Sequence, residues 1–132
     1  MIRIPKAIHE ELVAHAREGF PLEICGILGG VDNEVSAIYR MTNTDASNEH
    51  FMMDPKEQFA VVKDLRAKGL TMLANYHSHP ESPARPSGED IRLALTPGVS
   101  YLIISLADPR QPVVGSYKIE QGKVDAEDVE II

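Results

Sequence analysis

The chain has 132 residues, and 20 Asp and Glu against 13 Lys and Arg give it a formal charge of −7. This length suits one domain spanning residues 1–132, and a content of 43% hydrophobic and 25% charged residues excludes disordered and fibrous proteins. An acidic chain without basic runs is a poor partner for nucleic acid or an anionic membrane, because phosphate groups are bound by clustered Lys and Arg.

Further features of the sequence concern its compartment. The single cysteine, Cys25, allows no internal disulfide and fits a reducing environment. The N-terminus lacks the apolar core of a secretory signal, and the longest uncharged stretch, Leu93 to Ala107, is too short to cross a bilayer. We therefore expect a soluble cytoplasmic protein, either a monomer or a small oligomer such as a homodimer.

Hydrophobic periodicity and turn residues predict a mixture of helices and strands. Ile8, Leu12 and Ala16 share one stripe of the first helix, Asp32-Asn33 is a plausible turn between two strands, and Gly29-Gly30 are interpreted as turn glycines. In chain order, we predict a helix over 5–18, strands over 24–28 and 35–41, a polar loop over 42–49, a helix from 54, a strand over 70–76, a stiff loop over 80–86, a short helix over 87–95, strands over 100–106 and 113–119, and a last short segment.

The second helix has a strong start signal. Asp54-Pro55-Lys56-Glu57 supplies an N-cap acid, a proline at the first position and a glutamate three residues after the cap. Phe59, Val62 and Leu65 are expected to form the apolar face of this helix, and Gly69 is expected to end it. Together the elements predict a mixed α/β fold of the α+β type, with a sheet covered by two main helices.

His77 and His79 lie two residues apart at the end of a predicted strand, so their side chains project to the same side. Two such imidazoles can bind one metal ion, and a carboxylate is a common third ligand of zinc. Asp90, in the first turn of the next helix, is the best candidate for that third place, which leaves a fourth position for water. The alternative is that the histidines cap the strand end or bond to core carbonyls.

The other candidate residues also admit structural interpretations. Ser87 and Asp90 form a Ser-x-x-Asp pattern at a helix start, which resembles a capping box, although Glu or Gln is the usual partner. A metal-activated water needs a base, and Glu23 is the candidate because it stands beside a buried apolar run. An acid at such an edge can instead be a cap or a surface charge, and spacing alone does not connect it to the histidines.

Three segments taken together carry a family resemblance. Glu23 precedes the run Cys25 to Gly30, His77-Ser78-His79-Pro80 follows, and Ser87-Gly88-Glu89-Asp90 comes last. This arrangement resembles the JAMM (MPN+) zinc metalloprotease family, and in particular its small stand-alone prokaryotic branch. The family pattern is a glutamate near the N-terminus, then His-x-His-Pro, a spacer to a serine, and an aspartate three residues beyond it. The spacer of seven residues, 80–86, matches.

The resemblance implies a role for each matching residue. His77, His79 and Asp90 would bind one zinc ion. Glu23 would act as general acid and base on the zinc-bound water, and Ser87 would help to hold the oxyanion that develops when the peptide carbonyl is attacked. The implied fold is the cytidine-deaminase-like JAMM/MPN fold, a curved mixed β-sheet with helices packed against it.

The resemblance also implies a class of substrate. Relatives hydrolyse peptide or isopeptide bonds at the C-terminal tail of ubiquitin-like proteins, and the prokaryotic branch is associated with sulfur-carrier proteins. We therefore expect such a tail as the partner. A catalytically silent scaffold of the same fold and a zinc hydrolase of small-molecule amides are the alternatives.

The remaining distinctive residues are given structural interpretations. Cys25 is expected to be a small buried core residue, because no histidine is marked as the base of a Cys-His pair. His9 and His15 are expected to be partly exposed on the first helix. His50 and Phe51 could line a substrate groove, although Phe51 is better explained as a packing anchor of its loop.

Overall fold

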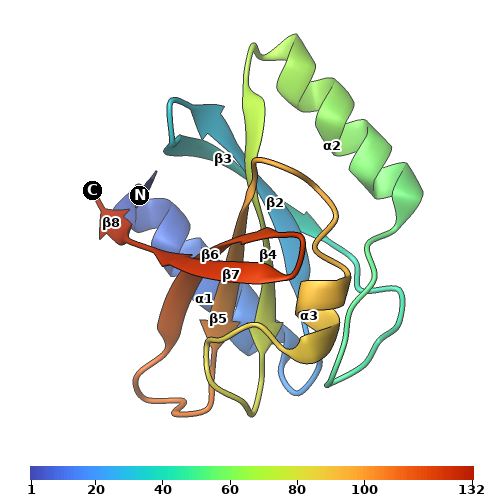
Figure 1. The fold of residues 1–132 in the computed structure, drawn as a ribbon, viewed down its shortest axis with the longest axis vertical. Helices are drawn as coiled ribbons and strands as arrows, with labels where there is room; N and C mark the ends of the chain where they lie inside the picture. The colour runs from blue at the N-terminus through green and yellow to red at the C-terminus, as the bar shows by residue number, and fades with distance from the viewer.

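Eight strands form a mixed sheet, and three helices pack against it in the computed structural model, which describes residues 1–132 (Figure 1). The strands are β1 (Ile2–Ile4), β2 (Cys25–Val31), β3 (Glu34–Met41), β4 (Thr71–His79), β5 (Ser100–Ser105), β6 (Val113–Glu120), β7 (Lys123–Glu127) and β8 (Val129–Ile131). The helices are α1 (Lys6–Gly19), α2 (Pro55–Ala67) and α3 (Gly88–Arg92). The order across the sheet is β7-β6-β5-β4-β2-β3-β1-β8.

The sheet curls so strongly that its two ends come together. Its edge strands β7 and β8 are consecutive in the chain, and only Asp128 separates them. Strand β4 pairs in parallel with β5, and β1 pairs in parallel with both β3 and β8, whereas the other neighbouring strands are antiparallel. The termini therefore lie side by side on β1 and β8 (Figure 1), and β4 lies near the middle of the sheet. This confirms the predicted α/β class with a curved mixed sheet.

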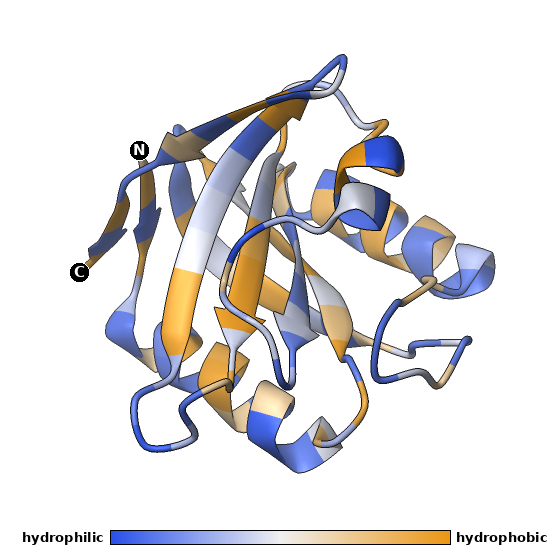
Figure 2. Cartoon of the chain, turned by 60° about the horizontal axis from the view of Figure 1, so that its bottom comes forward, coloured by the Kyte–Doolittle hydropathy of each residue, from blue (hydrophilic) through white to orange (hydrophobic).

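The helices cover both faces of the sheet. Leu12 and Ala16 of α1 belong to a buried cluster with Tyr76, whereas Val61 and Leu65 of α2 belong to a second cluster with Cys25 and Ile27. In Figure 1, α1 passes behind the strands and α3 lies in front of them. Figure 2 shows the most apolar residues on the central strands and polar residues along the connecting loops. No helix of the chain has the length and apolar character needed to cross a membrane.

Most predicted elements are confirmed for local reasons. The stripe of Leu12 and Ala16 is buried, with Ile8 packed beside it. Asp32 and Asn33 join β2 to β3 with φ angles of 51° and 65°, the left-handed pair that suits a tight hairpin.

The start of α2 is also confirmed. The Asp54 side chain caps the helix by accepting a hydrogen bond from the Lys56 amide at 2.8 Å. Glu57 is used differently, because its carboxylate accepts hydrogen bonds from the amide and hydroxyl of Thr42, at 2.8 and 2.9 Å. Glu57 therefore ties α2 to the end of β3.

The predicted apolar face of α2 is right at Leu65 but wrong at Phe59 and Val62. Phe59 is 73% exposed and Val62 is 43% exposed, whereas Val61 and Leu65 are buried against the sheet. An α-helix has 3.6 residues per turn, so residues three apart and residues four apart both lie close to one face. The spacing of Phe59, Val62 and Leu65 and the spacing of Val61 and Leu65 are therefore equally compatible with a buried stripe. Only the position of the helix on the sheet decided between these two stripes.

Other differences concern glycines and short elements. Gly29 and Gly30 lie inside β2 rather than in a turn, at the point where the strand register shifts. A Cβ atom on Gly29 would lie 2.2 Å from a Leu65 methyl group, so the missing side chain lets α2 approach the sheet. Helix α3 is shorter than predicted, the last segment forms two strands, and the short strand β1 was not predicted.

Candidate metal centre and active site

The two histidines occupy the end of the central strand β4. The strand continues to His79, beyond its predicted end, and alternation places His77 and His79 on the face that α2 and α3 cover. Ser78 points the other way, and its hydroxyl accepts a hydrogen bond from the Ile24 amide at 2.9 Å. The Ser78 amide in turn donates to the Ile24 carbonyl at 3.0 Å. The segment next to Glu23 is thereby fastened to the histidine strand.

Three donor atoms converge at this end of β4. Asp90 Oδ2 lies 3.2 Å from His77 Nε2 and 3.0 Å from His79 Nε2, and the two imidazole nitrogens are 3.1 Å apart. Both imidazoles are buried, with exposed fractions of 3% and 4%. His77, His79 and Asp90 therefore form a group whose donor atoms are close enough together to hold one metal ion. The structure thus brings together the three ligands predicted from the sequence, here called the triad.

The capping interpretation of Ser87 and Asp90 is confirmed as well. Ser87 Oγ accepts a hydrogen bond from the Asp90 amide at 3.0 Å, and Asp90 Oδ2 accepts one from the Ser87 amide at 2.9 Å. The cap fixes the direction of the Asp90 carboxylate at the start of α3. The structural and the ligand interpretations are therefore compatible, because the cap aims the same oxygen that meets the histidines.

Different neighbours orient the two imidazoles. Nδ1 of His79 donates a hydrogen bond to the Pro83 carbonyl at 2.9 Å, which leaves the Nε2 lone pair free to bind a metal. His77 Nδ1 is buried and has no hydrogen-bond partner. The His77 ring instead stacks on Phe51, with ring centroids 4.5 Å apart and planes 23° from parallel. Phe51 therefore does for His77 by packing what Pro83 does for His79 by hydrogen bonding.

The protonation of the triad follows from burial and proximity. Burial lowers the pKa of His77, which favours the neutral ring that binds metals. Burial also opposes ionisation of Asp90, but hydrogen bonds from the two histidines outweigh it and hold the pKa of this carboxyl well below its usual range. For His79, burial is outweighed by Asp90 and by the Pro83 carbonyl, so its pKa is raised. A metal ion bound here would replace any proton held between these nitrogen and oxygen atoms.

The donor set suits zinc. Two imidazole nitrogens and one carboxylate oxygen are typical zinc ligands, and ligands about 2.0–2.2 Å from a tetrahedral ion lie about 3.3–3.6 Å from one another. The observed separations of 3.0 to 3.2 Å are slightly shorter than this. Without a cation or a proton between them, these lone pairs would repel one another. The residues present therefore fit a zinc ion.

Glu23 lies next to the triad in the segment between α1 and β2. Its side chain is 4% exposed, and Oε1 has no hydrogen-bond partner. Burial, opposed in part by His79, raises the pKa of Glu23 to about 7. The Glu23 amide donates to the Ser47 carbonyl at 2.8 Å, which holds the residue from the side of the 42–53 loop. A buried, unpartnered carboxyl with this pKa is suited to accept and release a proton near neutral pH.

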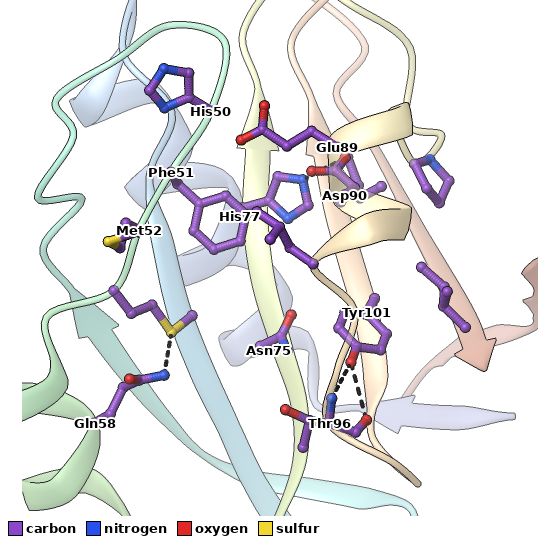
Figure 3. A pocket seen from close by; sticks show the side chains of 15 residues that line it. His50, Phe51, Met52, Gln58, Asn75, His77, Glu89, Asp90, Thr96 and Tyr101 are labelled. Atoms are coloured by element: carbon purple, nitrogen blue, oxygen red, sulfur yellow. Dashed lines mark hydrogen bonds and ion pairs between the residues drawn. The ribbon is translucent and has the colours of Figure 1, made fainter. Parts of the chain in front are cut away.

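Two cavities flank the triad. The apolar cavity, about 240 Å³, lies beside His77 and Asp90, and Figure 3 shows His77 between Phe51 and Asp90 at its wall. Its apolar lining includes Phe51, Met53, Leu93, Tyr101, Ile103 and Ile119. The polar cavity, about 260 Å³, has no hydrophobic residue in its lining, which consists of Glu23, Asn48, Glu49, His79, Glu81, Ser82 and Ser87. Glu23 and Ser87 are thus brought to the same cavity as His79 of the triad.

The other sequence interpretations have mixed outcomes. Cys25 is fully buried, and burial raises the pKa of its thiol to about 12, which agrees with a core residue and not with a nucleophile. The expectation for His15 is wrong, because it is buried and its Nδ1 lies 2.8 Å from the Tyr76 hydroxyl. Phe51 does anchor its loop by packing, but it packs on a metal-ligand candidate and lines a cavity.

Two supporting residues were missed. Asn43 lies in the polar 42–49 stretch, and its side chain bonds to the Glu23 carbonyl. The Pro83 carbonyl orients His79. A polar asparagine among loop residues and a backbone carbonyl carry no signal of this kind in the sequence. The alternation of His77, Ser78 and His79 does indicate that the serine faces away from the ligands.

Comparison with known proteins agrees with this geometry. The family described as prokaryotic homologs of the JAB domain (Prok-JAB) matches residues 5–119. The chain is 33% identical over 123 residues to the CysO-cysteine peptidase of Mycobacterium tuberculosis H37Rv, which covers 92% of this chain and 84% of that protein. It is 35% identical over 103 residues to the desampylase of Haloferax volcanii, covering 73% of this chain and 74% of the relative.

A solved structure extends the comparison to the whole fold. The solution structure of a protein from Desulfitobacterium hafniense has a TM-score of 0.91 and 50% identity, and covers 100% of this chain and 93% of its own. Since the family match spans most of the residues, the chain belongs to the Prok-JAB family. It is a peptidase of the JAMM type, as the resemblance of its motifs implied.

Proposed function

We propose that the protein is a zinc-dependent metallopeptidase in which His77, His79 and Asp90 hold one zinc ion and Glu23 is the general base. The observation that carries this proposal is the convergence of three donor atoms within 3.2 Å beside a buried carboxyl that has no partner. A bound zinc ion would lower the pKa of a water molecule to about 7 and polarise the carbonyl of the substrate.

The residues of the chain then move the proton and bind the developing charge. Glu23 takes a proton from the attacking water and delivers it to the leaving nitrogen, for which a pKa of about 7 is well matched. Ser87 Oγ accepts a hydrogen bond from the Asp90 amide, so its own hydroxyl proton remains available to the oxyanion. His79 keeps its orientation through the Pro83 carbonyl.

The substrate we propose is the C-terminal tail of a ubiquitin-like or sulfur-carrier protein, joined through a peptide or isopeptide bond. Two relatives that match most of the chain support it, since one is named a CysO-cysteine peptidase and the other a desampylase. A tail that ends in glycines suits this site, because it brings no bulky side chain close to the triad.

Intact-mass analysis tests this proposal. A Gly-Gly sulfur-carrier protein with a short C-terminal extension is incubated with zinc-loaded wild type, with Glu23→Gln, and with wild type plus a chelator. We expect trimming after Gly-Gly by the untreated wild type alone, and one zinc per chain in both wild type and Glu23→Gln. Cleavage that survives in Glu23→Gln would refute the role of this residue.

Other results identify the alternatives. A scaffold would bind the carrier protein without cutting it, and Glu23→Gln would leave that binding unchanged. A small-molecule hydrolase would bind zinc and lose its activity in Glu23→Gln but would not trim any protein tail.

A further inference from the structure

The two cavities differ in the reacting groups that line them. Glu23, His79 and Ser87 line the polar cavity, whereas His77 and Asp90 line the apolar one. If Glu23 protonates the leaving nitrogen, as the proposed function requires, that nitrogen must come within hydrogen-bond reach of its carboxyl. The amine half of the substrate therefore extends into the polar cavity, and the acyl half lies on the other side of the triad.

Resting on that proposed function, we propose that the polar cavity binds the leaving amine and that Glu49 and Glu81 determine its specificity. These two carboxylates select a lysine ε-amine, and thus an isopeptide bond, over the α-amine of a free amino acid. They are specificity-determining residues, and they take no part in the proton transfer.

The charges around the polar cavity support this assignment. Glu49 and Glu81 are exposed at its wall, neither belongs to an ion pair of the chain, and no Lys or Arg lines the cavity. Deeper in, Glu23 belongs to the same lining, is 96% buried, and its Oε1 has no hydrogen-bond partner within the chain. Carboxylates that line one cavity attract cations and repel anions.

The chemistry of the two products matches this charge. Hydrolysis adds the water oxygen to the carbonyl carbon and breaks the C–N bond. The nitrogen takes up both protons of the water, the first through Glu23 and the second as the acid product ionises, so it leaves as an ammonium ion and the acyl half leaves as a carboxylate. In a lysine isopeptide, four methylene groups separate the nitrogen from the backbone and no anion is near. In a free amino acid, the α-carboxylate lies beside the nitrogen and would face Glu49 and Glu81.

Three substrates that share one acyl half test the proposal. A Gly-Gly carrier protein is joined to the ε-amine of Nα-acetyl-lysine methylamide, to free alanine, or to alanine methylamide. We expect wild type to prefer the lysine isopeptide over free alanine by about tenfold in kcat/KM, and the methylamide to recover most of the loss. The preference should weaken at high salt, because exposed charges are screened.

The variant Glu49→Gln/Glu81→Gln should shrink this preference by about fivefold. Glu10→Gln/Glu130→Gln is the matched control, because it removes the same number of negative charges. Both of its residues are exposed, and neither lines a cavity beside the triad. An unchanged preference in the first variant, or an equal change in the control, would overturn the proposal. Failure of wild type to cut any of the three substrates would instead count against the proposed function.

A binding measurement tests the cavity without catalysis. Zinc-loaded wild type is titrated with Nα-acetyl-lysine methylamide, and backbone amide shifts are followed by NMR. We expect shifts at residues 48–49 and 81–82 that weaken in Glu49→Gln/Glu81→Gln. Shifts confined to the apolar cavity around Phe51 and Tyr101, or no saturable shift at all, would refute the assignment.

Discussion

The side-chain amide of Asn43 donates a hydrogen bond to the backbone carbonyl of Glu23, with 3.1 Å between nitrogen and oxygen. The same amide donates to the His50 carbonyl at 3.0 Å, and the side-chain oxygen accepts from the amides of Asp45 and Met52, each at 3.1 Å. One side chain therefore ties the candidate base to the loop beside it. Asn43 is a positioning residue for Glu23.

Asn43→Ala is expected to lower kcat by about 10- to 100-fold with little change in KM, because a general base that is displaced loses its alignment. Zinc content should stay at one per chain. Thr44→Val is the control, since it removes a hydrogen bond to the Met52 carbonyl in the same loop without touching Glu23. Equal losses in both variants, measured by steady-state kinetics, would assign Asn43 a loop-stabilising role only.

Phe51 is expected to control zinc affinity, because its ring holds the His77 imidazole, whose Nδ1 has no hydrogen-bond partner. Phe51→Ala should weaken zinc binding by about 10- to 100-fold, the range seen when an orienting neighbour of a metal ligand is removed. Phe51→Tyr, which keeps the stacked ring, should stay within a few fold of wild type. Competition with a chromophoric chelator measures both, and equal affinities in wild type and Phe51→Ala would contradict the role.

Ser87 caps α3, and in the proposed mechanism its hydroxyl also donates toward the reacting carbonyl. Two substitutions separate these roles. Ser87→Ala should lose about 1 kcal/mol of stability with the cap, and about 100-fold or more in kcat. Ser87→Asn keeps a good capping residue but lacks the hydroxyl, so it should recover stability and not activity. Chemical denaturation measures the first role and steady-state kinetics the second. Full activity in Ser87→Asn would show that Ser87 acts only as the helix cap.

The stability of the fold should fall in acid because of His15. Burial, and then the nearby Arg40, lower the pKa of this imidazole from 6.5 to about 4, while Glu18 acts in the opposite direction. Its ring is hydrogen bonded to the buried Tyr76 hydroxyl. As the pH falls, the His15 imidazole is therefore protonated near pH 6.5 in the unfolded chain but only near pH 4 in the folded chain. The free energy of unfolding should decrease between these values, by up to about 3 kcal/mol.

His15→Asn removes this titration and keeps a polar group near the position of Nδ1. Its stability should change less than that of wild type between pH 6.5 and 4, although it starts lower at pH 7.5 because packing is lost. Urea denaturation of both chains without zinc, across this range, measures the difference. Other carboxylates titrate in both proteins and cancel in the comparison, so parallel curves would exclude His15 as the cause.

Local pattern was enough to predict the three residues of the triad and much of the fold. Alternation along a strand places His77 and His79 on one side, and the serine cap of a short helix carries Asp90. The turn at Asp32-Asn33 follows from the conformations that those residues tolerate. Each of these features depends on neighbours within a few positions, so the sequence alone determined them.

Only the tertiary structure decided which distant groups meet the triad. Glu23 reaches His79 because β2 pairs with β4 in a register that no local pattern specifies. Phe51 and Asn43 act from a loop whose path depends on how α2 sits against the sheet. The stripe of α2 that became buried was decided in the same way, because packing free energy is gained only where a second element supplies a surface to bury against.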